Sequence, residues 1–376
     1  MVVITRWHII LVAAVILFLS LAQVAHQNQY DADVLRIVSS TINKGAAQSS
    51  SAPSLGPTTI ERTVTVTATA TQTVAGPTVT ETEVVKEKED CDERKAMWDP
   101  PFTVFNTTFE VPANIKYDPK GPRPDQIVLL TATDGKGHNE AIKDAVKLAK
   151  ENRKAYAEYH GYIDHFINIT KYDIPDIHPV WKKLPAIVES FNTFPEAQWV
   201  FWLDLDAIIM TPTVAVEKTI LSKEGMRKSL HGGAQLMVGS SEEKLDFWWP
   251  QEPDFENIDL IMAQDGATFN AGSFLIRRSL FSQWLLDIWA DPFFMHAGFT
   301  NREQDSMVHM MKHHPTVRKH TGVARQRSIN AFSEGPNWME WQKGDLLVHF
   351  AGCWVYNNCQ ERWTKYWDLK EQVPPK

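Results

Sequence analysis

The sequence is poor in cysteine and carries no excess of basic residues. Its three cysteines, Cys91, Cys353 and Cys359, are too few for a disulfide-rich scaffold in a chain of 376 residues. No pair of them has the CxxC spacing of a structural zinc site. Acidic residues outnumber basic ones by 46 to 38, which gives a formal net charge of −8. A chain without a basic surface is not expected to bind nucleic acid.

Apolar and aromatic residues, in contrast, are abundant. Apolar residues make up 43% of the sequence, and they include 14 tryptophans and 18 phenylalanines. Most of these aromatic residues follow Trp98, and we expect the majority of them to fill a folded core. The chain is longer than an average domain, so one large domain with appended segments is expected.

A nearly uninterrupted apolar run covers residues 9–25, which is the lower limit of what spans a bilayer. Arg6 precedes the run and acidic residues follow it, so the charge asymmetry favours a cytoplasmic N-terminus. We therefore predict a cytoplasmic tail over residues 1–8, a transmembrane signal anchor over residues 9–25 and a luminal body. A cleaved signal peptide is the alternative, although Gln23 does not suit a cleavage site at the end of the run.

The composition changes over residues 26–98. The central part of this segment is rich in Thr, Val, Ala and Ser, contains scattered Pro, and shows no helical period. Such segments do not build a core and are often O-glycosylated stalks. We therefore predict a disordered, Ser/Thr-rich stem, followed by a folded luminal domain over residues 99–376. A single strand of alternating Thr and Val is the alternative, but no nearby segment offers it a partner.

A luminal position of the domain agrees with two local features. Asn106 and Asn168 begin N-glycosylation sequons, although such sequons also arise by chance. In an oxidising lumen, Cys353 and Cys359 could close a small loop, which would leave Cys91 free or paired with another chain.

The folded domain alternates strands with helices. Apolar runs predict strands at residues 125–133, 162–168 and 198–203, and amphipathic segments predict helices at 139–159 and around 181–191. This order is typical of an α/β fold with a Rossmann-like, mostly parallel sheet. Ligands of such sheets bind beyond the carboxyl ends of the strands. Thr133, Asp134 and the Asp204-Leu205-Asp206 sequence lie at these ends.

The Asp204-Leu205-Asp206 sequence is informative because of its position rather than its pattern. An Asp-x-Asp pattern is expected about once by chance in a chain of this length, and residues 31–33 also form one. Asp204 and Asp206 follow a buried strand, and in extended chain they would share a face while Leu205 points into the core. Two such carboxylates can hold a hard divalent cation that bridges the phosphates of a nucleoside diphosphate. An acidic turn without a metal is the alternative.

Five sequence blocks occur in order between Asp125 and Tyr366. They cover residues 152–161, 181–210, 269–287, 303–306 and 349–353 and contain, among others, the strings WKKLP, FWLDLD, FNAGSFLIRRS, EQDS and HFAGC. The chain resembles, in these blocks, the glycosyltransferase family of fungal Golgi mannosyl- and galactosyltransferases and plant xyloglucan xylosyltransferases. The strings ATDGKGHNEAI and HFAGCWVYNNC are most similar to α-1,6-mannosyltransferase subunits of the fungal mannan polymerase complex.

The resemblance implies a GT-A type fold, in which helices flank a Rossmann-like mixed sheet, and a transfer that retains the anomeric configuration. It also implies that Asp204 and Asp206 bind a metal ion, with His349 as a further ligand. An imidazole ligand shifts the expected metal from Mg²⁺ toward Mn²⁺. Judged from the residues alone, His349 at the end of an apolar run is equally typical of a hydrogen-bonded structural histidine.

The resemblance also assigns roles beside the transferred sugar. Gln304 and Asp305 correspond to an acidic-amide cluster and are the predicted catalytic residues, since a carboxylate there can stabilise positive charge that develops on the sugar. The alternative is a solvent-exposed helix start. Asn270 and Gly272 would form a loop with close backbone approach to the donor, or Gly272 would only make a turn.

Other side chains are predicted to contact the nucleotide. Lys183 could meet the charge of the diphosphate, although a lysine on a helix surface is commoner. Arg153 and Tyr156 lie three residues apart on one helical face and could flank the nucleotide. The residues predicted to bind the nucleotide sugar are therefore Thr133, Asp134, Arg153, Tyr156, Lys183, Asp204, Asn270 and Gly272.

One departure from the family concerns the residue after Cys353. The plant members have a basic residue there, near the diphosphate, whereas this chain has Trp354. Lys183, Arg325 or another cation would have to take its place, or the donor is bound differently.

The sequence therefore predicts a retaining, metal-dependent α-1,6-mannosyltransferase in the Golgi membrane, which uses GDP-mannose to extend mannose-ended N-glycans. UDP-galactose is the alternative donor, and a complex with related glycosyltransferase subunits is expected. Three other functions are alternatives. A non-catalytic subunit of such a complex is one, and a carbohydrate-binding receptor is another. A glycoside hydrolase is the third, but no paired acid and nucleophile stands out.

Overall fold

The computed structural model describes residues 105–375, except residues 114, 116, 175, 238–243 and 267. The predicted tail, anchor and stem lie outside the described residues. No helix in the described part of the chain is long and apolar enough to cross a membrane.

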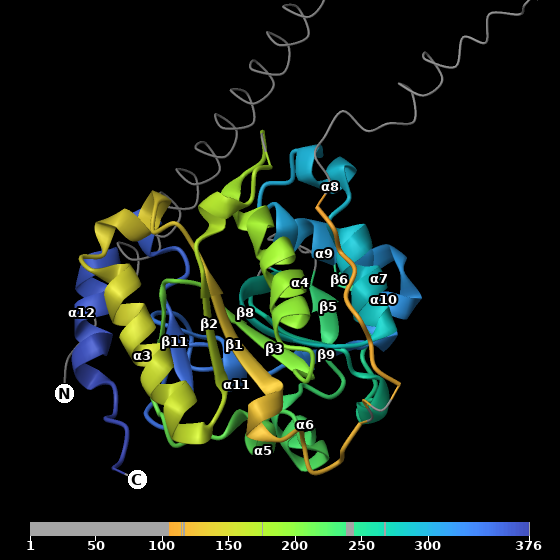
Figure 1. Cartoon of the computed structure of the whole chain (residues 1–376), viewed down its shortest axis with the longest axis horizontal. Helices are drawn as coiled ribbons and strands as arrows, with labels where there is room; N and C mark the ends of the chain where they lie inside the picture. The colour runs from red at the N-terminus through yellow and green to blue at the C-terminus, as the bar shows by residue number, and fades with distance from the viewer. Residues whose placement is uncertain are drawn as a thin grey trace, which may run out of the picture. The chain divides into compact units, whose positions relative to one another are not determined.

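A six-stranded mixed sheet forms the centre of the fold, with the strand order β2-β1-β3-β8-β7-β9 (Figure 1). The strands β1, β2 and β3 run parallel to one another, as do β7 and β9, whereas β8 is antiparallel to both of its neighbours. The carboxyl ends of five strands therefore meet the amino end of β8 at one edge. The bounds are β1 (Ile127–Ala132), β2 (Ile163–Ile167), β3 (Trp199–Leu203), β7 (Leu260–Gln264), β8 (Phe269–Arg277) and β9 (Thr321–Ala324).

The strand predictions hold to within two residues at each end. The predicted strands at 125–133, 162–168 and 198–203 correspond to β1, β2 and β3. All five residues of β3 are buried, as expected for a strand covered on both faces. The prediction of a mixed, mostly parallel sheet is thus confirmed.

Helices cover both faces of the sheet. Successive residues of a strand point to opposite faces, so alternate residues pack with different helices in two separate apolar clusters. On one face Val200 and Trp202 pack with the helices α4 (Lys183–Thr193), α7 (Leu280–Trp289), α9 (Glu303–His313) and α10 (Pro315–Lys319). On the other face Trp199 and Phe201 pack with α3 (Ala145–His160), α5 (Val216–Thr219), α6 (Lys223–Ser229) and α11 (Gln326–Ile329). The short helix α8 (Pro292–His296) contributes Phe294 to the first cluster.

The two predicted helices begin later than expected. The helix predicted from residue 139 begins at Ala145, because residues 137–141 form a 3₁₀ turn and Asp144 has a left-handed backbone with φ of 59°. It ends where Gly161 adopts φ of 86°, which is the usual glycine cap. In the second helix, Trp181 lies in a 3₁₀ turn, and α4 proper starts at Lys183.

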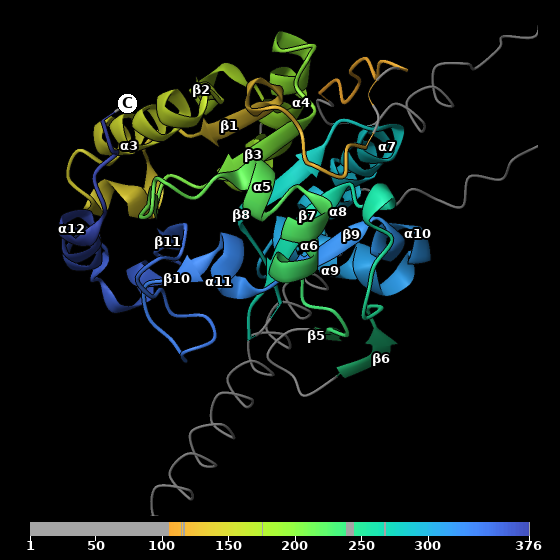
Figure 2. The ribbon, with the colours of Figure 1, turned by 90° about the horizontal axis from the view of Figure 1, so that it is seen from below.

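A small second sheet lies against α12 (Cys359–Leu369), and its strand order is β10-β11-β4 (Figure 2). The strand β4 (Ala207–Ile209) follows β3 after a short turn and pairs antiparallel with β11 (Leu347–His349). The strand β10 (Ala331–Phe332) pairs parallel with β11. A separate hairpin consists of β5 (Gln235–Met237) and β6 (Lys244–Trp248). The small sheet matters for the site because it joins the chain after β3 to the C-terminal part of the domain.

Candidate metal centre and adjoining cleft

The turn between β3 and β4 carries the two predicted metal carboxylates. Asp204 and Asp206 lie in this turn and not in extended chain, which corrects the expected strand geometry. The turn is held on both sides, since the Asp204 amide donates to the carbonyl of Gly272 at 2.8 Å and the Phe350 amide donates to the carbonyl of Asp206 at 2.9 Å. Leu205 is only 3% exposed and packs into an apolar cluster, as predicted.

His349 joins the two carboxylates because of the register of the small sheet. Ala207, which follows Asp206, is the pairing partner of His349, so the imidazole lies beside the turn. Its Nε2 atom is 3.6 Å from Oδ1 of Asp206. One ligand atom each from Asp204, Asp206 and His349 lies within 4.8 Å of the others. The three predicted metal ligands are therefore brought together.

Gly272 makes room for this imidazole. The residue lies within β8, so the predicted loop at residues 270–272 is wrong, and so is the idea that Gly272 only makes a turn. A Cβ atom at this position would lie 2.1 Å from Cε1 and 2.6 Å from Nε2 of His349. Any other residue would clash with the ring. Only glycine lets the backbone of β8 pass this close to the metal centre.

A chain of hydrogen bonds fixes the protonation of His349. The Gly272 amide donates to Oδ1 of Asn270 at 3.0 Å, so this oxygen is an acceptor. The atom of Asn330 that faces it at 2.8 Å must therefore be the amide nitrogen, which leaves Oδ1 of Asn330 to face Nδ1 of His349 at 3.0 Å. Since Oδ1 can only accept, Nδ1 carries a proton.

In a neutral imidazole, the same hydrogen bonds leave the lone pair of Nε2 on the side of Asp206. A neutral imidazole has one donor and one acceptor nitrogen, and the donor is used on Asn330. A lone pair and a carboxylate oxygen 3.6 Å apart cannot hydrogen-bond to each other, but a cation between them satisfies both. Second-shell hydrogen bonds of this kind are typical of metal-bound histidines. The residues present thus fit a divalent cation.

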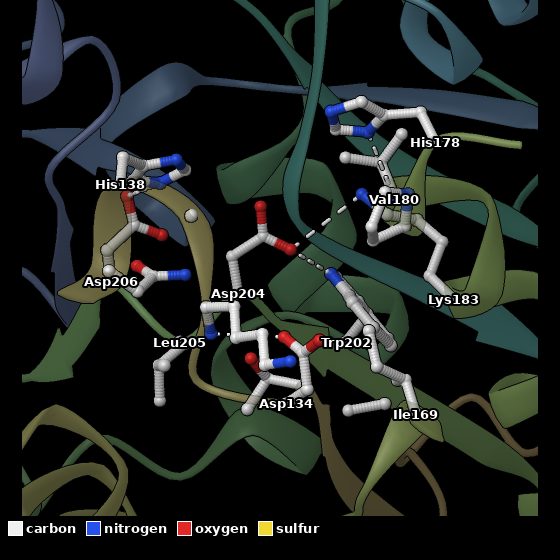
Figure 3. Close-up of a pocket in the computed structure, with 16 residues that line it drawn as sticks. Asp134, His138, Ile169, His178, Val180, Lys183, Trp202, Asp204, Leu205 and Asp206 are labelled. Atoms are coloured by element: carbon white, nitrogen blue, oxygen red, sulfur yellow. Dashed lines mark hydrogen bonds and ion pairs between the residues drawn. The ribbon is translucent and has the colours of Figure 1, made fainter. Parts of the chain in front are cut away.

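His138 contacts Asp206 from the other side and was not predicted as a site residue. Its Nε2 atom lies 3.3 Å from Oδ2 of Asp206, and this hydrogen bond raises the pKa of His138 (Figure 3). Burial alone would raise the pKa of Asp206. When no cation is bound, a positive charge on the His349 imidazole and the hydrogen bond from His138 outweigh burial and hold the pKa of Asp206 well below its usual value. Asp206 therefore keeps its negative charge. The sequence signals for His138 were its place in the loop after the first strand and in the string ATDGKGHNEAI.

Lys183 is buried, which was not expected for a lysine near the start of a helix. It is 3% exposed, and its Nζ atom donates to Oε1 of Glu303 at 2.8 Å and to the carbonyl of Ala271 at 3.0 Å. Nζ also lies 3.7 Å from Oδ1 of Asp204. Burial lowers the pKa of Lys183, but the carboxylates of Asp204 and Glu303 outweigh this effect and raise it. Glu303, a second unpredicted residue, is thus the counter-ion of a buried cation.

A cleft of about 280 Å³ adjoins the metal centre at the carboxyl ends of β1 and β3 (Figure 3). Thr133 and Asp134 line it, as the strand-end rule predicted, and Lys183 stands at its wall. Trp354 stands where the plant members have a basic residue, and Lys183 or Arg325 was expected to replace that charge. Lys183 lines the cleft, whereas Arg325 lines a different cavity. The other residues that line the cleft are Ala132, Lys136, Gly137, His138, Asn139, Ile169, His178, Pro179, Val180, Trp202, Asp204, Leu205 and Asp206.

Arg153 and Tyr156 are not part of the cleft, although both were predicted to flank a nucleotide. Arg153 is 1% exposed, and its Nη2 atom donates to the carbonyl of Asp204 at 2.6 Å. Burial lowers its pKa to about 10. The Tyr156 side chain is fully buried, and its hydroxyl donates to the carbonyl of Val214 at 2.6 Å. Arg153 therefore supports the turn that carries Asp204 and Asp206, and Tyr156 anchors the segment that follows β4.

The predicted catalytic pair lies at the start of α9. Gln304 accepts a hydrogen bond from the Ala271 amide at 2.8 Å, so it touches β8 next to Gly272. Asp305 instead accepts from the backbone and side-chain nitrogens of Asn301, at 2.8 and 3.1 Å. The structure thus brings Gln304 near the metal centre, whereas the Asp305 carboxylate is engaged by the preceding loop.

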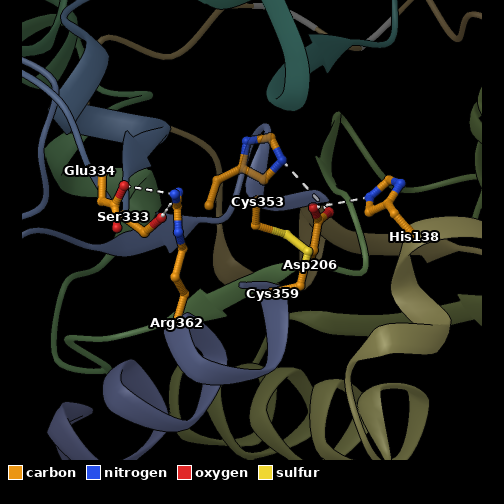
Figure 4. The surroundings of a disulfide bond; sticks show 8 residues. His138, Asp206, Ser333, Glu334, Cys353, Cys359 and Arg362 are labelled. Carbon is orange, nitrogen blue, oxygen red and sulfur yellow. Dashed lines mark hydrogen bonds and ion pairs between the residues drawn. A yellow bond between two sulfur atoms is a disulfide. The ribbon is translucent and has the colours of Figure 1, made fainter. Parts of the chain in front are cut away.

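A disulfide joins Cys353 to Cys359, as predicted, with the two Cα atoms 4.8 Å apart (Figure 4). It connects the turn that follows His349 to the first residue of α12. Cys91 lies outside the described residues. The bond therefore fixes the chain just beyond the candidate metal ligand His349.

Known proteins similar to this chain are glycosyltransferases. The profile of the galactosyl transferase GMA12/MNN10 family matches residues 123–360, which include the three residues of the metal centre. The probable α-1,2-galactosyltransferase gmh1 of Schizosaccharomyces pombe is 37% identical over 71% of this chain and 81% of its own length. The probable α-1,6-mannosyltransferase MNN10 of Saccharomyces cerevisiae is 30% identical over 66% of this chain and 67% of its own length. A crystal structure of a glycosyltransferase involved in the glycosylation of the major capsid of PBCV-1 matches with a TM-score of 0.43 and 14% identity, over 63% of this chain and 98% of that one.

Proposed function

The chain belongs to the galactosyl transferase GMA12/MNN10 family, and on this premise we propose that it is a retaining, metal-dependent hexosyltransferase of GT-A type. It transfers a hexose from a nucleoside-diphosphate sugar to a glycan. The observation that carries the proposal is the group formed by Asp204, Asp206 and His349 beside a cleft at the edge of the sheet. Open α/β sheets bind nucleotides at this edge.

Each residue of the site has a distinct task in the proposal. Asp204, Asp206 and His349 would hold Mn²⁺, or Mg²⁺ less well because of the imidazole. When bound, the cation supplies Lewis-acid neutralisation of the charge that grows on the departing diphosphate. Lys183 adds a fixed positive charge at the wall of the cleft, where it attracts the anionic donor. The side-chain oxygen of Gln304 accepts a hydrogen bond from the Ala271 amide. Its side-chain nitrogen can therefore donate to a sugar hydroxyl.

Of the donors, we propose UDP-galactose first and GDP-mannose second. The order reverses the expectation from the sequence blocks, because the galactosyltransferase relative is more similar to this chain than the mannosyltransferase relative, at 37% against 30% identity. The acceptor is a mannose-ended glycan in either case.

A thermal-shift panel distinguishes the donors. In the presence of Mn²⁺, a bound nucleotide sugar stabilises the folded chain in proportion to the logarithm of its concentration over Kd. We expect UDP-galactose to raise the melting temperature more than GDP-mannose or UDP-xylose at equal concentration. A larger shift with GDP-mannose would restore the mannosyltransferase assignment, and the absence of any Mn²⁺-dependent shift would argue for a non-catalytic subunit.

We further propose that the protein is anchored in the Golgi membrane by residues 9–25, with the stem and residues 99–376 in the lumen. The apolar run and the charges beside it support this topology. The disulfide agrees with an oxidising compartment. The strings that resemble mannan polymerase subunits support the further proposal of a complex with related subunits. Protease added to intact Golgi vesicles should leave residues 99–376 intact, and their digestion would refute the topology.

A further inference from the structure

A second cavity, of about 590 Å³, lies at the same edge of the sheet as the metal centre. It is formed where β7 and β9 end and where α11 begins. The helix α11 lies next to the small sheet, as Figure 2 shows. Trp338 and Asp345 complete it from the segment that precedes β11. The other lining residues are His231, Gln264, Asp265, Gly266, Val323, Ala324, Arg325, Gln326, Arg327 and Ser328. Nothing in the proposed donor site accounts for this cavity.

The strand order places the metal centre between the cleft and this cavity. The cleft lies at the ends of β1 and β3, the metal centre at the junction of β3 and β8, and the cavity at the ends of β7 and β9. In the ladder, Gln264 of the cavity pairs with Phe269, the residue before Asn270. Of the described residues, none lines both hollows. A donor in the cleft and a second substrate in the cavity would therefore approach the metal centre from opposite sides.

Hydrogen bonds connect the cavity to the metal centre through one residue, Asn330. Gln326, which lines the cavity, donates through Nε2 to the carbonyl of Asn330 at 2.6 Å. Asn330 is the residue that holds the Nδ1 atom of His349. The wall of the cavity and the metal ligand thus belong to one bonded network.

The cavity offers an aromatic ring and an unpaired acceptor. Trp338 is 52% exposed, and its ring lies beside Gly266, where a Cβ atom would be 3.9 Å from the ring. Gln326 is only 3% exposed, yet its Oε1 atom has no hydrogen-bond partner among the described residues. A buried acceptor without a donor is costly, and a hydroxyl group supplies the donor.

The charged side chains that line the cavity form ion pairs or hydrogen bonds with neighbouring protein groups. Arg327 forms a bidentate ion pair with Asp345, at 2.8 and 2.9 Å. The Nε atom of Arg325 donates to the carbonyl of Lys228 at 3.2 Å, and Asp265 accepts from the Thr268 amide at 2.8 Å. The cavity has an exposed indole, an unpaired acceptor and charged side chains that are paired with one another or with the backbone. These features suit a neutral ligand that has apolar C–H faces and a rim of hydroxyl groups. Saccharides have this chemistry.

We propose that this cavity is the acceptor subsite and binds the terminal hexose of a neutral glycan, stacked on Trp338 and hydrogen-bonded to Gln326. The inference rests on the proposed function. A hydroxyl oxygen of this hexose forms a bond to the anomeric carbon of the donor, and the bond from that carbon to the diphosphate oxygen breaks. The electron pair of the broken bond leaves with the diphosphate, which also takes up the hydroxyl proton.

Binding of α-1,6-linked mannobiose, measured by saturation-transfer NMR on the full chain in detergent with Mg²⁺, tests the proposal. We expect Trp338→Ala to weaken this binding by about tenfold or more, as for an aromatic anchor, and Trp338→Phe to restore part of it. Trp284→Ala is the matched control, because Trp284 is also partly exposed but lies on α7 and lines neither hollow. It should bind mannobiose as the unchanged chain does.

Equal affinity of Trp338→Ala and the unchanged chain would overturn the proposal, as would absence of mannobiose binding. If Trp338→Ala weakens UDP or GDP binding instead, the cavity belongs to the donor and the proposal is wrong. Because the measurement uses no donor, its outcome is independent of turnover. Failure of the proposed function would show separately, as absence of any donor cleavage.

Discussion

Replacement of Lys183 by methionine is expected to lower the free energy of unfolding by about 3–5 kcal/mol. Methionine matches the length of the lysine stem but removes its charge. Glu303, which is 5% exposed and bonded to Nζ at 2.8 Å, would then be a buried carboxylate without a counter-ion. Asp204 would also lose the cation that lies 3.7 Å from its carboxylate. A urea titration of the full chain measures the change.

A double variant separates the structural role of Lys183 from its role in binding. In Lys183→Met/Glu303→Leu both buried charges are absent, so we expect most of the lost stability to return. The affinity for the nucleotide sugar should stay low, because the positive charge at the wall of the cleft is still missing. A single Lys183→Met variant within about 1 kcal/mol of the unchanged chain would contradict the buried ion pair.

Gly272→Ala is expected to weaken Mn²⁺ binding by about 100-fold or more, because the imidazole of His349 cannot keep its place. The new Cβ atom would lie 2.1 Å from Cε1 of His349, so the ring or the strand must move. Movement of the ring breaks its hydrogen bond to Asn330 and withdraws Nε2 from Asp206. Electron paramagnetic resonance of free Mn²⁺ gives the dissociation constant.

Gly266→Ala is the matched control for this variant. Gly266 also lies at the carboxyl edge of the sheet, but a Cβ atom there would meet nothing closer than the Trp338 ring at 3.9 Å. The Mn²⁺ affinity of this variant should equal that of the unchanged chain. If Gly272→Ala also kept its affinity, His349 would not be a metal ligand in the arrangement described.

The sequence predicted β1, β2 and β3 of the main sheet because these strands are apolar runs, but it did not predict β7, β8 or β9. Residues 127–132 and 199–203 form short buried runs, and their length is typical of a strand rather than of a helix. The strand-end rule then located Asp204 and Asp206 at the functional edge. The prediction of His349 as their partner depended on family resemblance, and no local pattern could have replaced it.

What the sequence did not predict depends on contacts between distant parts of the chain. The pairing of Ala207 with His349 joins segments far apart in sequence, and no local periodicity encodes it. Arg153 and Lys183 were expected to face ligand or solvent, because long cations are seldom buried without partners. Their partners, the carbonyl of Asp204 and the carboxylate of Glu303, come from other elements. The role of Asn330 follows only from the hydrogen bonds around it.

The rate of sugar transfer to a mannose-ended glycan, with and without Mn²⁺, is the measurement that tests the metal centre most directly. The full chain with UDP-galactose or GDP-mannose should transfer sugar only when the metal is present. Asp206→Asn keeps the size of the side chain but removes the charge between His138 and His349, and we expect its rate to fall by about 100-fold or more at saturating Mn²⁺. Full transfer by Asp206→Asn, or transfer by the unchanged chain after complete removal of metal, would contradict the account.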